Sequence, residues 1–392
     1  MRRLVYRLDP RTPIAATMAT AIVTGLAPGL AEAAPCPPAI FWPDPTWTER
    51  QASGPSVEAM DDYAFTLVGR DDERRGIRTD GVVVVHRGQI IYERYGRGFG
   101  PDNPHLTWSV SKSMLDAMFG AAVYQGYLDP LDSVCDHYDA VNECAMTPTD
   151  LRAMGSGLDW NEGYEDEPYH LSSVIAMLYG YGALDMAAFV GRHRSEAPPG
   201  TLYRYSSGDS VLLAAVVAGS LPPDLRSTYP HDFIFGPIGM QSAIFERDRA
   251  GTVVGSSYAY ATPRDMARFG YLYLHDGCWA GERLLPEGWV EQSRAVNPVF
   301  LVEASFEWSR DGDAVPGSHW WTNHAIPDLG ITSVWPDVPA DAYAASGHWG
   351  QSITVIPSEE LVVVRTADDR EYRVLDRNRF LSLAIAIAQE AE

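Results

Sequence analysis

The sequence predicts a mixed α/β (α+β) fold: an antiparallel β-sheet built from both chain ends, flanked by helices, plus a mainly helical subdomain. Three observations predict it: paired β-rich runs at 81–95, a second pair at 352–365, and mainly helical sequence between them. Because the two hairpins lie at opposite ends of the chain, we expect one sheet assembled from both, with the middle of the chain as an insertion.

The composition is that of a globular protein. Of the 392 residues, 46% are hydrophobic and 11% aromatic, which is enough apolar surface for a large core and excludes a disordered chain. The formal net charge is -22. A field of that sign repels phosphate backbones and anionic membrane surfaces, so we expect no nucleic-acid partner.

Residues 1–34 have the layout of a secretory signal peptide, with arginines first, then an apolar run at 14–30, then small residues. That run falls short of the ~20 strongly apolar residues that span a bilayer. We therefore expect export to the periplasm or the extracellular space, without stable membrane insertion after cleavage. The remaining domain, 35–392, is divided into a sheet part at about 60–125 and 250–392 and a helical subdomain at about 126–249.

Four cysteines follow the predicted signal peptide: Cys36, Cys135, Cys144 and Cys278. An even number in an oxidising compartment favours disulfides. We expect a local bridge between Cys135 and Cys144, which leaves Cys36 with Cys278; the alternative is four buried free thiols. No Cys/His cluster indicates a zinc site, and no cofactor is expected.

The elements follow from hydrophobic periodicity. The first hairpin is predicted at 81–86 and 89–95, joined by Arg87 and Gly88, and the second at 352–357 and 361–365. Helices are predicted at 109–127, 149–154, 171–178, 186–190, 207–218 and 379–389. The helix at 109–127 is apolar on nearly all sides, which is typical of a helix buried in the centre of a protein.

Ser109 and Lys112 lie three residues apart at the start of that central helix. Positions i and i+3 share a helix face, so the lysine amine is expected one turn from the serine hydroxyl. A serine hydroxyl needs a base to become a nucleophile, and burial lowers the pKa of an amine toward the range where it can be that base. The helix amino terminus adds N–H groups where an acyl oxyanion would form.

Lys112 is also the only lysine in the chain. An Arg-rich codon usage or an acidic, salt-adapted surface explains the bias toward arginine, but not why one lysine remains. Arginine can replace lysine in an ion pair but does not lose its proton in a protein. The retained lysine therefore indicates a site that needs a neutral amine.

Tyr205 comes just before the apolar helix at 207–218. Its hydroxyl is a candidate proton relay to a leaving group, provided that cationic neighbours lower its pKa. In a chain with 20 tyrosines, an ordinary core or surface tyrosine is the alternative.

A third element is the segment His348 to Gln351, which precedes the strand at 352–357. Its glycines would let a substrate approach an edge strand, and we expect the N–H of Gln351 to complete an oxyanion hole with that of Ser109.

With these motifs in this order, the chain resembles the serine β-lactamase-like superfamily, which includes class C β-lactamases, D-alanyl-D-alanine carboxypeptidases, esterases and the 6-aminohexanoate-dimer hydrolase branch. The resemblance covers about residues 60–388. It rests on S-x-x-K at Ser109 to Lys112, Y-x-N at Tyr205 to Ser207 and K-T-G at His348 to Gly350. It implies that Ser109 is acylated, that Lys112 is the base and that Tyr205 moves protons.

Two departures bear on the substrate. Ser207 stands where the family has asparagine, and His348 stands where β-lactamases have the lysine that binds the antibiotic carboxylate. An imidazole is mostly uncharged above a pH of ~6.5, so it offers a carboxylate no fixed positive charge. With Trp349 and Gly350 as further substrate-binding residues, the resemblance implies an exported serine hydrolase for a small ester or amide rather than for penicillins. The alternative is a non-catalytic or single-acylation relative that acts as a sensor or cell-wall-binding protein.

Other candidates are interpreted as structural. His319 and His324 lie five residues apart, a poor metal spacing, and are interpreted as ordinary loop histidines. An acidic cluster is interpreted as a solvated loop rather than a calcium or cationic-substrate site; it consists of Glu162, Glu165, Asp166 and Glu167. No G-x-S-x-G motif is present, which disfavours an α/β-hydrolase.

Overall fold

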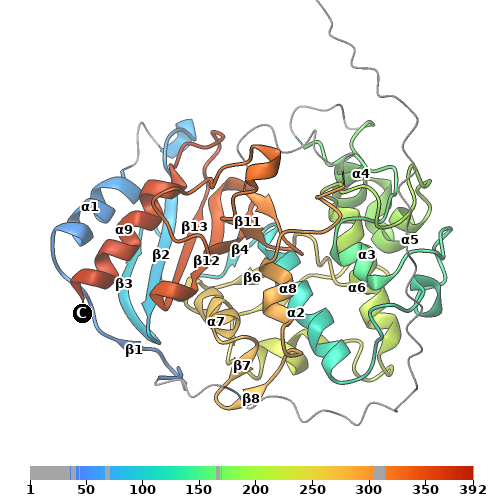
Figure 1. Cartoon of the computed structure of the whole chain (residues 1–392), viewed down its shortest axis with the longest axis horizontal. Helices are drawn as coiled ribbons and strands as arrows, with labels where there is room; N and C mark the ends of the chain where they lie inside the picture. The colour runs from blue at the N-terminus through green and yellow to red at the C-terminus, as the bar shows by residue number, and fades with distance from the viewer. Residues whose placement is uncertain are drawn as a thin grey trace, which may run out of the picture. The chain divides into compact units, whose positions relative to one another are not determined.

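An eight-stranded sheet forms the frame of the fold, in the order β1-β3-β2-β13-β12-β11-β10-β9. Its strands are β1 (Thr48–Glu49), β2 (Thr79–His86), β3 (Gln89–Tyr95), β9 (Val315–Pro316), β10 (Trp321–Thr322), β11 (Tyr343–Gly347), β12 (Gln351–Ile356) and β13 (Leu361–Ala367). Strand β2 pairs antiparallel with β13, with Val84 opposite Val363. This pairing joins the two hairpins from opposite ends of the chain, which confirms the predicted sheet (Figure 1).

These coordinates come from a computed structural model that describes residues 36, 41–43, 45–66, 71–164, 168, 170–302 and 314–391. All of them belong to one unit, Pro35–Glu392. The signal peptide predicted at 1–34 lies outside the described residues. In the part that is described, no helix is long and apolar enough to cross a membrane.

The turn between β2 and β3 shows how local sequence sets the hairpin. Arg87 and Gly88 have φ of 49° and 79°. Two successive left-handed residues match the type I′ turn, whose twist fits that of the flanking strands. The two-residue connection predicted from the sequence is therefore the one that the chain uses.

Helices α1 (Pro55–Ala64) and α9 (Arg377–Glu390) pack on one face of the sheet, and α2 (Val110–Tyr124) and α7 (Pro263–Leu274) pack on the other (Figure 1). The other α-helices are α3 (Pro148–Arg152), α4 (Ser173–Tyr179), α5 (Met186–Gly191), α6 (Ser207–Ser220) and α8 (Trp289–Arg294). Alternate residues of β2 explain the two layers: Val82 and Val84 pack in the cluster with α1 and α9, whereas Val83 and Val85 pack in the cluster with α2 and α7. Each predicted helix is present, with ends shifted by a few residues.

Helix α2 lies at the centre of the molecule. Every residue from Val110 to Ala122 is buried, and α2 contacts α6, β11 and β12. Its amino terminus, with Ser109 at the N-cap, therefore lies where the sheet meets the helical part. Two short sheets lie nearby, one of β4 (His105–Leu106), β5 (Ile244–Phe245) and β6 (Ala259–Ala261), the other of β7 (Cys278–Trp279) and β8 (Glu282–Arg283).

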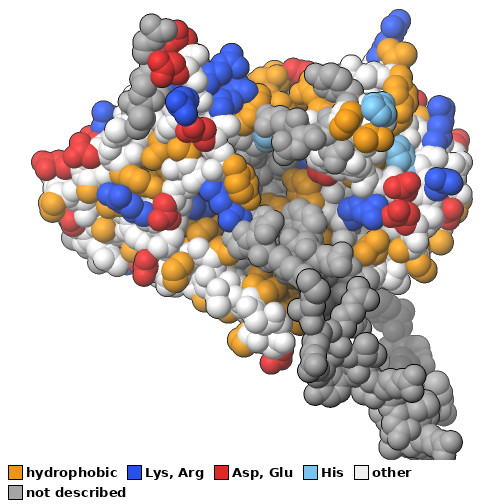
Figure 2. All heavy atoms as spheres, turned by 90° about the horizontal axis from the view of Figure 1, so that it is seen from above, with side chains coloured by type: hydrophobic (Ala, Val, Ile, Leu, Met, Phe, Trp, Pro, Cys, Tyr) orange, Lys and Arg blue, Asp and Glu red, His pale blue; other side chains and the backbone are white. Residues whose placement is uncertain are grey.

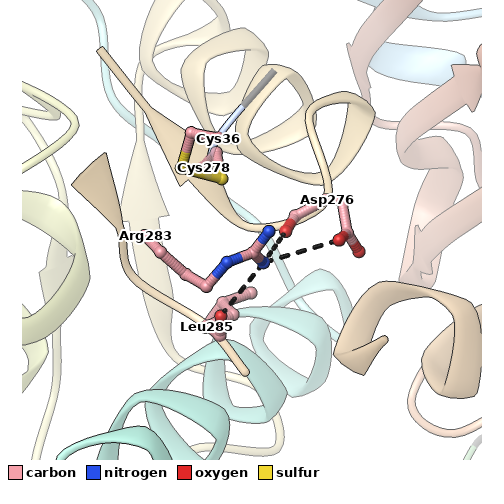
Figure 3. Close-up of a disulfide and its surroundings, with 5 residues drawn as sticks. All are labelled: Cys36, Asp276, Cys278, Arg283 and Leu285. Carbon is pink, nitrogen blue, oxygen red and sulfur yellow. Dashed lines mark hydrogen bonds and ion pairs between the residues drawn. A yellow bond between two sulfur atoms is a disulfide. The ribbon is translucent and has the colours of Figure 1, made fainter. Parts of the chain in front are cut away.

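All four cysteines form disulfides, in the expected pairs Cys36–Cys278 and Cys135–Cys144. The first closes a separation of 242 residues and ties the start of the described chain to β7. Next to it, Arg283 donates hydrogen bonds to the carbonyl oxygens of Asp276 and Leu285 (Figure 3). These bonds fix the turn that carries Cys278.

Charged groups do not gather into one patch on the face shown in Figure 2. Basic side chains are scattered there among acidic and hydrophobic ones. On this face, the arrangement differs from the continuous basic surface that a nucleic acid would need.

Candidate active site

Ser109 and Lys112 come together as the helical spacing predicts. The preceding residue, Trp108, has a left-handed φ of 50° and turns the chain into α2, so that Ser109 caps the helix. Atom Nζ of Lys112 lies 3.2 Å from Oγ of Ser109. This is within hydrogen-bond distance, so the amine can receive the hydroxyl proton.

The amine of Lys112 has two further partners. It donates to the carbonyl oxygen of Ser256 at 2.9 Å and to Oγ of Ser207 at 3.0 Å. The side chain is 2% exposed. Burial lowers the pKa of Lys112 to about 8, although the charge of Glu162 acts in the opposite direction. A neutral amine is therefore accessible close to physiological pH.

Tyr205 packs beside this pair. Its ring centroid lies 4.9 Å from Nζ of Lys112, it stacks on Trp321 at 5.7 Å, and its hydroxyl shares a hydrogen bond with Ser109. The relay role is predicted on condition that cationic neighbours lower the pKa of Tyr205, and that condition is not met. Burial, with the nearby charge of Glu162, raises the pKa of Tyr205 above its ordinary value. The phenol is therefore protonated at neutral pH and suited to donating a proton.

One pocket contains all three predicted catalytic residues. It is lined by Ser109, Lys112, Met154, Tyr203, Tyr205, Gly317, His319, Trp320, Trp321 and Ser346. Apart from Lys112 and His319, these residues are uncharged and mostly aromatic or small. Such a wall favours an apolar or neutral group next to the nucleophile.

The segment expected to complete the oxyanion hole packs beside the residues that lead into Ser109, but it does not line the pocket. Residues His348–Gly350 form a turn after β11, and none of them, nor Gln351, is among the residues lining the pocket. The side-chain amide of Gln351 is fully buried and bonds with the backbone of Ala367, which ties β12 to β13. His348 stacks on Tyr164 at 5.4 Å and packs against Trp108 at 5.5 Å.

The end of β11 takes the place expected for that segment. A side chain at Gly347 would collide with the carbonyl oxygen of Thr107, so β11 passes directly beside the residues that lead into Ser109. Ser346, the preceding residue, lines the pocket. Ser346 shares the pocket with Ser109, whereas Gln351 is not among the residues that line it. No sequence pattern indicates this difference, because the strand register decides it.

Glu162 is a site residue that the sequence analysis missed. Its carboxylate accepts hydrogen bonds from Nε1 of Trp160 at 2.6 Å, from the Ser207 N–H at 2.9 Å and from Oγ of Ser207 at 2.5 Å. The interpretation of Glu162 as part of a solvated acidic loop is therefore wrong. The other members of that cluster, 165–167, lie outside the described residues.

His319 lies in the turn between β9 and β10, where a loop histidine is expected, but its side chain is only 7% exposed and lines the pocket. Its carbonyl accepts from Oγ of Ser113 at 2.6 Å and its Nε2 lies 3.3 Å from Oγ of Ser210, which links α2 to α6. Burial lowers the pKa of His319 to about 4. The imidazole is therefore neutral beside Lys112.

No group of three or more His, Cys, Asp or Glu side chains that could hold a metal ion occurs among the residues with described positions. The chemistry available at the pocket is that of a hydroxyl, an amine and a phenol. The hydroxyl can attack an acyl carbon while the amine accepts its proton and the phenol donates one to the leaving group.

Comparison with known proteins identifies the family of this chain and its relatives. A family model described as Beta-lactamase matches residues 64–385. The 6-aminohexanoate-dimer hydrolase of Paenarthrobacter ureafaciens is 26% identical over 247 residues, which are 60% of this chain and 62% of that protein, less than two thirds of the relative's length.

Solved structures share the fold. A candidate 6-aminohexanoate-dimer hydrolase from Bacillus anthracis is 23% identical, with a TM-score of 0.65 and coverage of 89% of each chain. A penicillin-binding protein homologue from Caulobacter crescentus is 15% identical, with a TM-score of 0.57 and coverage of 86% of this chain and 97% of that one. The family match supports the expectation of an enzyme, a serine hydrolase. The match over most of the chain shows that this protein belongs to the Beta-lactamase family.

Proposed function

We propose that this protein is an exported serine hydrolase that cleaves a small ester or amide through an acyl-enzyme on Ser109. The observation that carries the proposal is the buried amine of Lys112, 3.2 Å from the Ser109 hydroxyl, with a pKa lowered to about 8. An amine in that state can accept a proton that a surface lysine cannot.

In the acylation step, Lys112 takes the proton from Oγ of Ser109 while Oγ bonds to the substrate carbonyl carbon. The oxyanion that forms lies against the N–H of Ser109 at the amino terminus of α2. Tyr205 gives its proton to the departing alcohol or amine and regains one from the Lys112 ammonium. Water then repeats the sequence in reverse, which frees the acid and restores Ser109.

Two parts of the chain supply these groups in this proposal. The sheet part, about 60–125 and 250–392, contributes the serine and the lysine, and the helical subdomain, about 126–249, contributes the tyrosine. Export is supported by the two disulfides, which persist in oxidising compartments.

The substrate class follows from the lining of the pocket. Apart from Lys112, the side chains that line the pocket are neutral and many are aromatic, and His348 packs against the rings of Trp108 and Tyr164. We therefore favour uncharged esters and linear amides over penicillins. The name of the Paenarthrobacter relative makes the 6-aminohexanoate dimer one amide to include in a panel with p-nitrophenyl esters, D-amino-acid amides and nitrocefin.

A fluorophosphonate probe tests the nucleophile. It is expected to label the folded protein at Ser109, and Ser109→Ala is expected to abolish the labelling. Labelling at another residue, or none in protein shown to be folded, would remove the proposed activity.

A further inference from the structure

A chain of hydrogen bonds runs behind the proposed base, from the carboxylate of Glu162 through the hydroxyl of Ser207 to the amine of Lys112. Oγ of Ser207 lies 2.5 Å from Oε1 of Glu162 and 3.0 Å from Nζ of Lys112. The same carboxylate is held by Nε1 of Trp160 and by the backbone N–H of Ser207. Three donors therefore converge on this one carboxylate.

In the series of hydrogen bonds from Glu162 to Lys112, the donor and acceptor capacities of the groups fix the direction of each bond. An ionised carboxylate only accepts, so the hydroxyl proton of Ser207 points to Glu162. The Ser207 oxygen must then accept from Lys112. The carbonyl oxygen of Ser256, 2.9 Å from Nζ, also only accepts.

A neutral amine has two N–H donors and one lone pair. With its two donors used by Ser207 and the Ser256 carbonyl, the remaining partner of Nζ is Oγ of Ser109, at 3.2 Å. The lone pair of Lys112 is thereby directed at the one hydroxyl that must lose a proton. Were Ser207 free to rotate, its own proton could point at Nζ and occupy that lone pair.

We propose that Glu162 is a positioning residue of the acylation step: through Ser207 it turns the lone pair of Lys112 toward Ser109. This rests on the proposed function, in which Lys112 is the base. The proton of Ser109 passes to Nζ, and the ammonium so formed lies one hydroxyl away from the carboxylate of Glu162, which stabilises it.

Other titratable groups face the same site and must be separated from Glu162. They are Tyr164, Tyr205, Asp209 and His319. Burial raises the pKa of Tyr164 and Tyr205 and lowers that of His319, so these three are neutral at neutral pH. Burial also raises the pKa of Asp209 to about 7, so Asp209 titrates in the range of interest.

The test is the pH profile of kcat/KM for p-nitrophenyl acetate, in the full-length protein and in Glu162→Gln. In the parent, activity should rise with pH as Lys112 loses its proton. Removing the carboxylate removes the charge that raises the pKa of Lys112, so the rise should move to lower pH by about one unit. The plateau value of kcat/KM at high pH should fall about 10-fold, because the amine of Lys112 is less basic and its lone pair is less well directed at Ser109.

Two control variants test whether the pH shift is caused by the loss of the Glu162 carboxylate. Asp159→Asn removes an exposed carboxylate three residues away and should leave the profile in place. The shift should also persist when Glu162→Gln is measured in an Asp209→Asn background, which excludes titration of Asp209 as its source. If Glu162→Gln does not fold, Ser207→Ala breaks the same chain and should lower the plateau to a similar degree.

The outcomes separate the two proposals. A parent protein that is labelled by fluorophosphonate at Ser109, with a profile that Glu162→Gln leaves unmoved or moves to higher pH, overturns the role of Glu162 alone. An unchanged plateau of kcat/KM in Ser207→Ala likewise overturns the role of Glu162 alone. A parent protein without labelling at Ser109 overturns the proposed function itself.

Discussion

Replacing Lys112 with arginine keeps a positive charge next to Ser109 but removes a base. The parent amine has a pKa of about 8, so at pH 7 about one tenth of the molecules carry it neutral. A guanidinium stays protonated at that pH in effectively all molecules. Hydrolysis of p-nitrophenyl acetate at pH 7 should therefore fall by ~10² or more, the usual contribution of general-base catalysis.

The assay needs a control for packing, because Lys112 is fully buried and arginine is larger. Overpacking a core typically costs about 1–3 kcal/mol, which thermal unfolding followed by circular dichroism would register. Lys112→Met, similar in length and unable to bind a proton, separates loss of the base from distortion. Both variants should unfold cooperatively and both should be inactive. An arginine variant that hydrolyses the ester at close to the parent rate would refute the assignment of Lys112 as the base.

Two predictions concern stability. The pKa of Lys112 is about 8 in the folded protein against an ordinary 10.5. Between pH 8 and pH 10.5 the unfolded chain therefore binds more protons than the folded one, and the free energy of unfolding rises with pH by about 3 kcal/mol. Below pH 8 the destabilisation caused by burying the charged amine is constant. Urea unfolding of the parent and of Lys112→Met at pH 7.5 and 10.5 should show the parent gaining that amount relative to the variant, and an equal response of the two would contradict the lowered pKa. Removing the Cys36–Cys278 bridge, which spans 242 residues, should cost more free energy of unfolding than removing the bridge that spans 9, about 5 against about 3 kcal/mol in the chain-entropy model. Thermal melts of the paired Cys→Ser variants check the order, and a smaller loss for the long bridge would count against the model.

Local features of the site could be read from the sequence. The distance between Ser109 and Lys112 follows from helical geometry alone, since residues three apart at a helix start share a face. The hairpin turn at Arg87 and Gly88 and the alternation of buried valines in β2 are likewise short-range patterns. They need no knowledge of the rest of the chain.

What the sequence left unresolved depends on contacts between distant segments. Glu162 sits in an acidic stretch that looks solvent-exposed, and only the placement of its loop against the start of α6 brings it to Ser207. Which residue of this segment lines the pocket depends on how far β11 extends; Ser346 lines it, whereas Gln351 does not. Similarly, His319 is buried because a turn between two short strands enters between α2 and α6.

The pKa of Tyr205 illustrates a further limit. A lysine nearby suggests that the tyrosine pKa falls, but in the folded protein burial and the charge of Glu162 raise it, and they outweigh the hydrogen bond with Ser109 that lowers it. Which influence prevails depends on how completely the ring is enclosed, and a motif does not encode enclosure.

The most direct measurement is mass mapping of the protein quenched in acid during turnover of p-nitrophenyl acetate. The account predicts an acetyl group on the peptide that contains Ser109, present during turnover and absent once the substrate is consumed. An acetyl group on a different residue, or turnover that leaves Ser109 unmodified at every time of quenching, would contradict it.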